Sequence, residues 1–299
     1  MDNRTKICAV VVTYNRKEKL KRCIKCLLEQ RDVSCNIIIV DNASSDGTKE
    51  MIMDFFSKEG IFYYNTGTNL GGAGGFEYGV REAILKGYKY IWIMDDDTWP
   101  DKNALKELFV ADKELNGNWG FLSSIAYWTD GTLCKANIQK KGLFKFAKKN
   151  DYQSKICRVQ FASFVSLLVK RDVVCEIGLP IGEYFIWTDD YEYTGRISKD
   201  YPGYMVCSSK VIHAMNTHMK ASIIKDDISR AERYKYLFRN DVHCYRQYGI
   251  AGWLYIILKD VYMVVNVILN SSDKKNRLSI IVNGFIRGCL FSPKVNYVK

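Results

Sequence analysis

The stretch that decides the fold is Ile91-Trp-Ile-Met-Asp95-Asp96-Asp97-Thr-Trp-Pro100. Four apolar residues typical of a buried strand lead directly into three consecutive aspartates and then a turn. Adjacent carboxylates repel one another, so this arrangement is costly unless a cation or sugar hydroxyls compensate the charge. Open α/β sheets bind their ligands at the carboxyl ends of strands, which is where the triplet falls. Taken alone, the segment could also be a solvated acidic turn.

Strand and helix patterns alternate through the first hundred residues. Strands are predicted at 7–13, 36–40, 61–65 and 90–94, and helices at 17–30, 45–57 and 75–85. This alternation predicts βαβ units, a mostly parallel sheet and right-handed crossovers. Three of the strands end in Thr13-Tyr14-Asn15, Asp41-Asn42 and Asp95-Asp96-Asp97. We expect these polar side chains to line one crevice at the same edge of the sheet.

The rest of the chain is less regular and then becomes helical. Strands are predicted at 120–127 and 160–170, on either side of a basic loop at 135–158. The acidic-aromatic segment 184–193 is followed by a helix expected to end near residue 199. Further helices are predicted at 224–248, 252–270 and 277–290. We therefore expect an α/β domain over residues 1–220 and a basic helical region over 221–299.

Charge and cysteine content narrow the class of protein. The 299 residues carry a net charge of +11, and residues 224–299 alone hold 13 Lys and Arg against 6 Asp and Glu. Such basic regions attract nucleic acid, anionic membranes or phosphorylated substrates. No nucleic-acid motif is recognised, so a specific nucleic-acid partner is not expected. The ten cysteines are scattered, which argues against a zinc site. Residues 1–4 lead directly into a strand, so we expect no signal peptide and a cytoplasmic protein.

The segment 252–270 is nearly long enough to span a bilayer, but Lys259 and Asp260 lie near its middle. A charge at that depth costs roughly 2.5–3.5 kcal/mol on insertion scales. We therefore expect a helix on the inner face of the cell membrane, with Trp253, Tyr255 and Tyr262 at the headgroup boundary. A helix packed in the core or between subunits of a homo-oligomer, and a true span, are the alternatives.

Three motifs occur in order: Val10-Val-Val-Thr13-Tyr14-Asn15-Arg16, Ile39-Val-Asp41-Asn42-Ala-Ser-Ser-Asp46-Gly47-Thr48, and the aspartate triplet. Together they resemble the inverting family 2 glycosyltransferases, over residues 7 to about 218. Within that family, segments 69–76 and 187–193 most resemble galactofuranosyltransferases, with rhamnosyltransferases next. The resemblance implies a GT-A fold, a Rossmann-like mostly parallel sheet flanked by helices. Its nucleotide-binding half would cover about 1–100 and its acceptor-binding half about 101–220.

The resemblance also implies roles for residues that would bind a nucleotide-sugar donor. These residues are Thr13, Tyr14, Asn15 and Asp41 at the nucleoside, Asp96 near the ribose or donor sugar, and Asn69, Gly71 and Gly72, where the backbone can approach the donor closely. Asp41 could accept a hydrogen bond from a pyrimidine N–H. It could instead cap the following helix, as Asp46 or Ser45 could also do.

A divalent cation and a general base complete the implied site. Asp95, Asp97 and His213 would coordinate Mn²⁺ or Mg²⁺, with His218 as a second candidate for the histidine ligand and His243 as a structural residue. Asp190 would be the base, and adjacent carboxylates raise one another's pKa, which suits a base near neutrality. Asp189 or Glu192 would orient the acceptor, and Trp187 would stack on it or lie in the core.

The function implied is transfer of a single sugar, galactofuranose from UDP-galactofuranose, onto a lipid-linked or growing cell-surface glycan. A single transfer is expected because the chain lacks the large N-terminal β-domain of galactofuran polymerases and its C-terminal helices are compact. The alternatives are rhamnosyl transfer from dTDP-rhamnose and a non-catalytic scaffold of glycan assembly.

Overall fold

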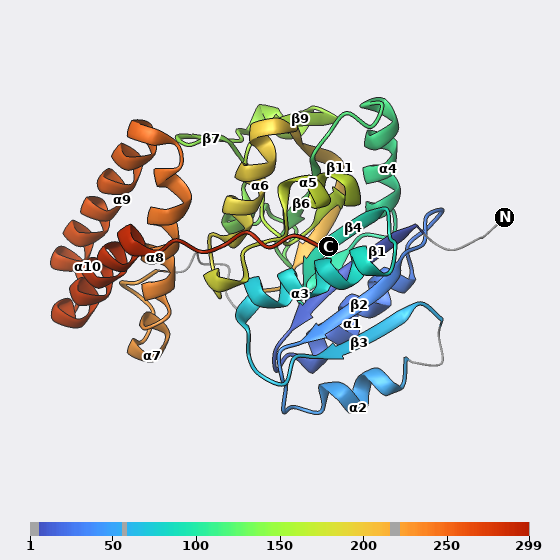
Figure 1. The fold of residues 1–299 in the computed structure, drawn as a ribbon, viewed down its shortest axis with the longest axis horizontal. Helices are drawn as coiled ribbons and strands as arrows, with labels where there is room; N and C mark the ends of the chain where they lie inside the picture. Colours follow the sequence, from blue (N-terminus) through green and yellow to red (C-terminus); the bar gives the residue numbers. More distant parts are fainter. Residues whose placement is uncertain (1–5, 56–58, 216–221, 299) are drawn as a thin grey trace.

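The structure, a computed structural model, describes residues 6–55, 59–215 and 222–298. Within these residues nine strands form one sheet in the order β3-β2-β1-β4-β10-β6-β11-β5, with β9 also paired to β11. The strands are β1 (Ile7–Thr13), β2 (Asn36–Asp41), β3 (Ile61–Asn65), β4 (Tyr90–Asp95), β5 (Thr98–Pro100), β6 (Phe121–Tyr127), β9 (Ile156–Val159), β10 (Leu167–Lys170) and β11 (Gly203–His213). The helices flanking this sheet are α1 (Lys17–Leu28), α2 (Thr48–Met53), α3 (Gly71–Leu85), α4 (Ala104–Glu114), α5 (Arg171–Ile177) and α6 (Asp189–Asp200) (Figure 1).

The predicted parallel core is confirmed, and it collects strand ends at one edge. β1 pairs in parallel with β2 and with β4, so that Thr13 lies opposite Asp41 and Val12 opposite Asp95. β10 runs antiparallel between β4 and β6, and β11 is parallel to β6. β11 therefore points in the same direction as β4, and its last residue, His213, reaches the same edge as the aspartates. This is the edge at which α/β sheets bind ligands.

The strands of the core are apolar without interruption because both faces of the sheet are covered. In β1, Val10 packs on one face with α3, and Ala9 and Val11 pack on the other with α1. Gly79 of α3 lies so close to the sheet that a Cβ atom there would be 2.4 Å from Val10 Cγ1. The glycines of α3 therefore allow it to pack tightly against the parallel strands.

Several predicted elements differ in extent. The helix expected at 75–85 begins at Gly71, and the helix expected at 45–57 is the shorter α2 in the described residues. The strand predicted at 160–170 is limited to β10, because the backbone of Phe161 bonds to Lys140 instead. The basic loop at 135–158 contains the short elements η1 (Lys135–Asn137), β7 (Lys140–Gly142), β8 (Lys145–Phe146), η2 (Lys149–Gln153) and β9.

The C-terminal helices pack beside the α/β part rather than over it (Figure 1). They are α7 (Ile228–Ala231), α8 (Tyr234–Arg246), α9 (Gly249–Asn270) and α10 (Lys274–Leu290), and the single helix predicted at 224–248 is thus two helices. Phe238, Val267 and Ile281 form the centre of their own apolar core. The chain then runs back across the α/β part, where the Leu179 N–H donates to the Asn296 carbonyl at 2.8 Å.

The longest of these helices, α9, has its polarity reversed relative to an ordinary surface helix. It has 22 residues, and an 18-residue window within it has a mean hydropathy of 1.6, so it is long and apolar enough to cross a membrane by length and composition alone. Its charged pair faces the protein, because Lys259 pairs with Asp241 of α8 and Asp260 is buried. Apart from Asn270 at its end, its exposed side chains are apolar, and the large ones are Ile250, Leu254, Ile257, Leu258, Val261, Tyr262, Val265, Ile268 and Leu269.

Candidate active site

The acidic triplet and a histidine from a distant part of the chain meet at the sheet edge. β5 pairs with β11 so that Thr98 lies opposite His213, and the Ala214 N–H donates to the Asp97 carbonyl at 2.8 Å. One potential ligand atom from each of Asp95, Asp97 and His213 lies within 4.8 Å of the others. His213 Nε2 is 3.2 Å from Asp97 Oδ1. The structure therefore brings together the three residues expected to bind a metal.

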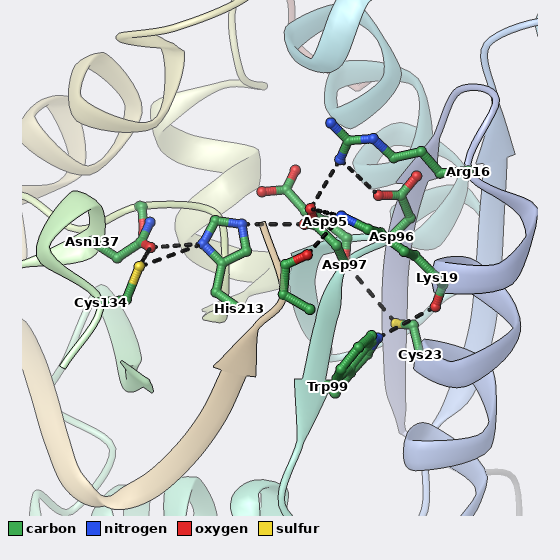
Figure 2. Close-up of polar contacts among 12 residues, drawn as sticks. Arg16, Lys19, Cys23, Asp95, Asp96, Asp97, Trp99, Cys134, Asn137 and His213 are labelled. Atoms are coloured by element: carbon green, nitrogen blue, oxygen red, sulfur yellow. Dashed lines mark hydrogen bonds and ion pairs between the residues drawn. The ribbon is translucent and has the colours of Figure 1, made fainter. Parts of the chain in front are cut away.

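The ring of His213 is held from behind, as Figure 2 shows. Its Nδ1 lies 2.7 Å from Asn137 Oδ1 and 4.0 Å from Cys134 Sγ. The Asn137 amide nitrogen donates to Ser163 Oγ at 3.0 Å, so its oxygen is the atom that faces the ring. His213 Nδ1 must then be the donor, which leaves Nε2 directed at the aspartates. A second partner on the far ring nitrogen is typical of metal-binding histidines.

Two basic side chains compensate the triplet from the other side. Arg16 Nη1 lies 3.2 Å from Asp96 Oδ1 and 3.1 Å from Asp97 Oδ2 (Figure 2). Lys19 of α1 lies 3.4 Å from Asp97 Oδ2. Thr13 Oγ1 donates to Asp96 Oδ2 at 2.8 Å. Asp96 is thereby bound to the end of β1, separately from the Asp95, Asp97 and His213 group.

The three aspartates titrate differently because their partners differ. Burial raises the pKa of Asp96 to about 7, against the opposing charge of Arg16. Burial also raises the pKa of Asp95, and the charge of Asp97 adds to that effect. For Asp97, the contacts with His213 and Arg16 outweigh burial and hold its pKa well below the usual range. Burial acts to lower the pKa of His213, but contact with Asp97 raises it to about 10.

The loops after β1 and β2 are joined at the expected nucleoside site. Asn15, with a positive φ of 52°, donates its N–H to Ser44 Oγ at 2.8 Å. The fully buried Asp41 accepts hydrogen bonds from the Ser44 N–H at 2.8 Å and from the Tyr63 hydroxyl at 2.7 Å. Tyr14 is exposed. These two loops are therefore joined in one wall, on which Tyr14 and Asn15 are exposed.

The capping role considered for Asp41 is wrong. The N–H group of Thr48, at the start of α2, donates to Asp46 Oδ1 at 3.2 Å. Asp41 instead accepts hydrogen bonds from Ser44, in the loop before that helix, and from Tyr63. Its carboxylate therefore stays at the end of β2.

The glycine-rich segment is the first turn of α3. Asn69 Oδ1 accepts from the Gly71 N–H at 2.9 Å, and the Asn42 amide donates to the Gly71 carbonyl at 2.9 Å. Gly71 has a φ of +72°, and a Cβ there would lie 2.1 Å from the Phe185 carbonyl oxygen. Gly72 is not crowded in this way, because a Cβ there would lie 4.0 Å from its nearest neighbour, on the Phe76 ring. Packing thus explains Gly71, whereas Gly72 leaves room beside the helix start.

The segment expected to carry the base begins α6. Asp189 is buried, and burial together with the charge of Asp190 raises its pKa well above the usual range. Burial also raises the pKa of Asp190 to about 7; the hydrogen bond from the Tyr191 N–H opposes this rise and the charge of Asp95 adds to it. The charge of Asp95, one of the metal candidates, therefore acts on the candidate base.

The two remaining acceptor candidates have protein partners. Both carboxylate oxygens of the buried Glu192 accept hydrogen bonds from Arg196, at 2.8 and 3.0 Å. Trp187 is half-buried, and its ring centroid lies 4.9 Å from that of Tyr234 on α8. The carboxylate of Glu192 is therefore occupied by an ion pair within α6. Trp187 packs against the core of the C-terminal helices, while part of it stays accessible.

Of the other two histidines, His243 is the one that the structure describes, and it does not join the site. Position 218 lies outside the described residues. His243 is buried on α8, and its Nδ1 lies 2.6 Å from the Tyr184 hydroxyl. Burial lowers the pKa of His243 to about 4, so this residue is neutral and structural in character.

Sequence reasoning missed two basic residues at the candidate site, Arg16 and Lys140. Arg16 stands in the first motif, but nothing local indicates that it reaches the aspartate triplet. Lys140 of β7 is buried, and its Nζ donates to the hydroxyls of Tyr245 at 3.0 Å and Tyr255 at 3.3 Å. Its Nζ also lies 4.6 Å from the ring centroid of Tyr191, next to Asp190. Long-range contacts place these side chains, so no spacing in the sequence could reveal them.

The donor set fits a hard divalent cation. Carboxylate oxygens and one imidazole are ligands that Mn²⁺ and Mg²⁺ accept. Among the described residues, the buried Asp97 Oδ1 has no hydrogen bond of good geometry, although it faces His213 Nε2. A cation bound between these atoms would satisfy the oxygen. Asp95, Asp97 and His213 are therefore the residues that would hold it.

Replacing Asn137 with alanine should weaken metal binding without removing a ligand. Without its partner at Nδ1, the His213 ring can rotate, and loss of such a partner typically lowers metal affinity about 10–100-fold. Isothermal titration with MnCl₂ measures this affinity. Asn150→Ala, at an exposed position of the same region, should bind Mn²⁺ like the unchanged protein. Equal affinity in the Asn137 variant would contradict the role given to this contact.

Several solved structures share this fold. Staphylococcus aureus TarS (residues 1–349) matches with a TM-score of 0.56 and 12% identity, over 96% of this chain and 72% of that one. The mannosyltransferase PcManGT of Pyrobaculum calidifontis, solved with GDP-Man and Mn²⁺, matches with a TM-score of 0.56 and 14% identity, over 97% and 77%. At these identities the likeness shows the fold alone, which is GT-A.

Proteins related in sequence include two kinds of sugar transferase. The galactofuranosyltransferase GlfT1 of Mycobacterium tuberculosis is 32% identical over 194 residues, which cover 63% of this chain and 63% of that protein. The dTDP-rhamnosyl transferase RfbF of Shigella flexneri is 24% identical over 91% of this chain and 90% of that protein. The match thus spans somewhat less than two thirds of the galactofuranosyltransferase. The family model for glycosyl transferase family 2 matches residues 8–175. With this match and a site built at the carboxyl edge of its sheet, the chain belongs to glycosyl transferase family 2.

Proposed function

We propose that the protein is an inverting glycosyltransferase that moves one galactofuranose residue from UDP-galactofuranose to a lipid-linked or growing glycan of the cell envelope. The observation that carries this proposal is the grouping of Asp95, Asp97 and His213 at one sheet edge, and the effect of the Asp95 charge on the raised pKa of Asp190 supports the choice of Asp190 as the base. The similarity to galactofuranosyltransferase GlfT1 supports the choice of sugar.

Asp190 is the proposed general base. Inverting transfer needs one group that removes the proton of the acceptor hydroxyl as that oxygen attacks the anomeric carbon. A pKa raised by burial to about 7 leaves Asp190 both ionised in a useful fraction and basic enough for this step. Asp189 is the proposed acceptor-orienting carboxylate, because Glu192 is bound to Arg196. The accessible part of Trp187 is the proposed stacking surface for the acceptor sugar.

The donor would lie along the ends of β1, β2 and β4. The nucleoside contacts proposed are Thr13, Tyr14, Asn15 and Asp41, and those to the diphosphate or sugar are Asn69, Gly71, Gly72 and Asp96. Mn²⁺ or Mg²⁺ held by Asp95, Asp97 and His213 would neutralise charge on the departing diphosphate. Gly72 is the glycine with room beside it, so it is the proposed point of closest backbone approach.

Rhamnosyl transfer from dTDP-rhamnose is the second candidate function. It is favoured by the rhamnosyltransferase RfbF, whose similarity to this chain is lower but extends over 90% of its length. Both reactions would use the same metal group and the same base, so only the donor pocket distinguishes them.

Release of nucleoside diphosphate from a panel of donors tests the proposal. The purified protein with Mn²⁺ and a short-chain glycolipid acceptor should release UDP from UDP-galactofuranose, and not from UDP-galactopyranose or UDP-glucose. Release from dTDP-rhamnose instead would replace the sugar and keep the family chemistry. Binding of none of these donors would favour a non-catalytic scaffold.

Asp190→Asn should lower the rate of transfer by about 10²–10⁴-fold, the usual contribution of a general base, while donor affinity stays the same. In the unchanged enzyme the rate should rise with pH up to about 7, because only ionised Asp190 can accept the proton. Bound metal would offset the charge of Asp95, so the rise of the rate with pH should then occur at lower pH.

The unfolding temperature of Asp190→Asn serves as the control that this variant is folded. A raised pKa means that the folded protein binds the proton of Asp190 more tightly than the unfolded chain does. The stabilising effect is complete below the pKa of the unfolded chain and is lost as the pH rises through about 7. At pH 8 the buried carboxylate is charged, so the neutral side chain of the Asp190→Asn variant should let it unfold at the same or a higher temperature. Full activity of this variant would remove Asp190 from the mechanism.

We also propose that the outer face of α9 rests on an anionic membrane surface. Its exposed side chains are apolar, whereas Lys274, Lys275 and Arg287 are exposed on the adjacent α10. An apolar face beside basic residues is typical of helices that lie in the headgroup region. Of the aromatic residues expected there, only Tyr262 is strongly exposed, since Trp253 packs near Phe285 and Tyr255 contacts Lys140. The proposed location is the cytoplasmic face of the cell membrane.

The triple variant Leu254→Gln, Leu258→Gln, Tyr262→Gln should lose binding to vesicles that contain phosphatidylglycerol, measured by co-sedimentation. The matched control, Met53→Gln, Leu85→Gln, Val110→Gln, changes exposed apolar residues of other helices and should bind normally. Undiminished binding of the triple variant would contradict the proposal. A dimer in sedimentation analysis, without vesicle binding, would assign the face to a second copy of the chain.

A further inference from the structure

The four residues that precede the base-bearing helix have an unusual backbone. Phe185, Trp187 and Thr188 have φ values of 66°, 65° and 66°, in the left-handed region that residues with a Cβ seldom adopt. Thr188 is followed directly by Asp189 and Asp190 in the first turn of α6. A segment in this conformation persists only where its surroundings enforce it. The direction in which α6 presents Asp190 therefore depends on whatever holds residues 185–188.

A buried side chain of α8, that of Asn240, contacts this segment at several points. The amide nitrogen of Asn240 donates to three carbonyl oxygens of the segment and the residue before it: Tyr184 at 3.0 Å, Ile186 at 3.0 Å and Trp187 at 2.9 Å. Arg239 donates its Nε and Nη2 to Asn240 Oδ1, at 2.9 and 2.8 Å. This contact fixes which end of the amide faces the segment. Asn240 is fully buried, so water cannot replace these bonds.

The neighbours of Asn240 on α8 hold the same segment. Thr188 Oγ1 donates to the buried Asp241 Oδ1 at 2.8 Å, and Lys259 of α9 pairs with the other oxygen of Asp241. Arg239 Nη2 donates to the Glu183 carbonyl at 2.8 Å. Three consecutive residues of the C-terminal helices are thus bonded to the chain that leads into α6.

The opposite side of the segment touches the expected donor site. The Phe185 carbonyl accepts from the Ala73 N–H at 3.2 Å, and Gly71 lies directly against that carbonyl. Residues 185–188 are therefore placed between the start of α3 and α8. A shift of this segment would change the distance between Asp190 and a sugar held near Gly71 and Gly72.

We propose that Asn240 is a positioning residue for Asp190, acting through the backbone of residues 185–188 with Asp241 in support. The proposal rests on the assignment of Asp190 as the general base. It gives α8 a part in catalysis that the family motifs, all N-terminal to residue 194, do not include. A base displaced by about 1 Å loses about 100-fold in rate.

Asn240→Asp tests this role, because it keeps the size of the side chain and removes the donor group. We expect kcat to fall by about 100-fold, with little change in donor affinity measured by titration. The acid limb of the kcat profile should also move, because Asp190 would lie in altered surroundings. Thr188→Val is the milder second variant, because it removes only the hydroxyl bound to Asp241. It should also lower kcat, by less than Asn240→Asp does.

Arg246→Met is the matched control on the same helix. Arg246 also donates to three backbone carbonyls, of Gly288 at 3.0 Å, Cys289 at 2.8 Å and Phe291 at 2.6 Å, but none belongs to residues 185–188. Its loss should lower the unfolding temperature and leave kcat and the pH profile unchanged. An equal loss of kcat in Arg246→Met would overturn the proposal, because α8 would then act only through general stability.

The two assignments can fail separately. If Asp190→Asn is inactive but Asn240→Asp and Thr188→Val turn over with unchanged kcat and pH profile, Asp190 remains the base and the positioning role of Asn240 is wrong. If Asp190→Asn is active, the base assignment fails first, and the positioning proposal fails with it. If Asn240→Asp does not fold, Thr188→Val alone decides, since unchanged kcat in that variant contradicts the proposal.

Discussion

Repulsion among three adjacent aspartates is the constraint on which the rest of the site depends. Carboxylates brought together away from water need positive charge close by. Arg16 from the loop after β1, Lys19 from α1 and His213 from the end of β11 provide it. Each comes from a different element, so the triplet can be accommodated only when the sheet is complete. The same need for positive charge makes this edge suited to a divalent cation.

The need to compensate the aspartates also involves residues that do not touch them, as the orientation of His213 shows. Asn137 fixes the ring, and Ser163 fixes Asn137, so residues well outside the sheet edge determine which nitrogen faces the aspartates. On the other side, the charge of Asp95 contributes to the raised pKa of Asp190. The groups proposed for metal binding and for proton transfer are therefore electrostatically connected.

The C-terminal helices combine an inward polar surface with an outward apolar one. Asn240, Asp241 and Lys259 face the α/β part, where they bond to the chain that leads into α6 and to one another. The apolar residues of α9 face outward. We propose that this helical region, bonded on one side to the chain that leads into α6 and resting on a membrane with the other, brings a lipid-linked acceptor close to Asp190.

By itself, the sequence determined the parallel core, because β1, β2 and β4 are continuous apolar runs followed by polar residues and parallel strands end at a common edge. Its resemblance to family 2 glycosyltransferases also indicated Asp95, Asp97, Asp190 and His213. Only the tertiary structure decided that Gly71 serves close packing against Phe185, that Glu192 is bound to Arg196, and that Asn240 holds residues 185–188. The reason is physical: strand and helix patterns come from neighbours in sequence, whereas these contacts join side chains distant along the chain and leave no periodic trace.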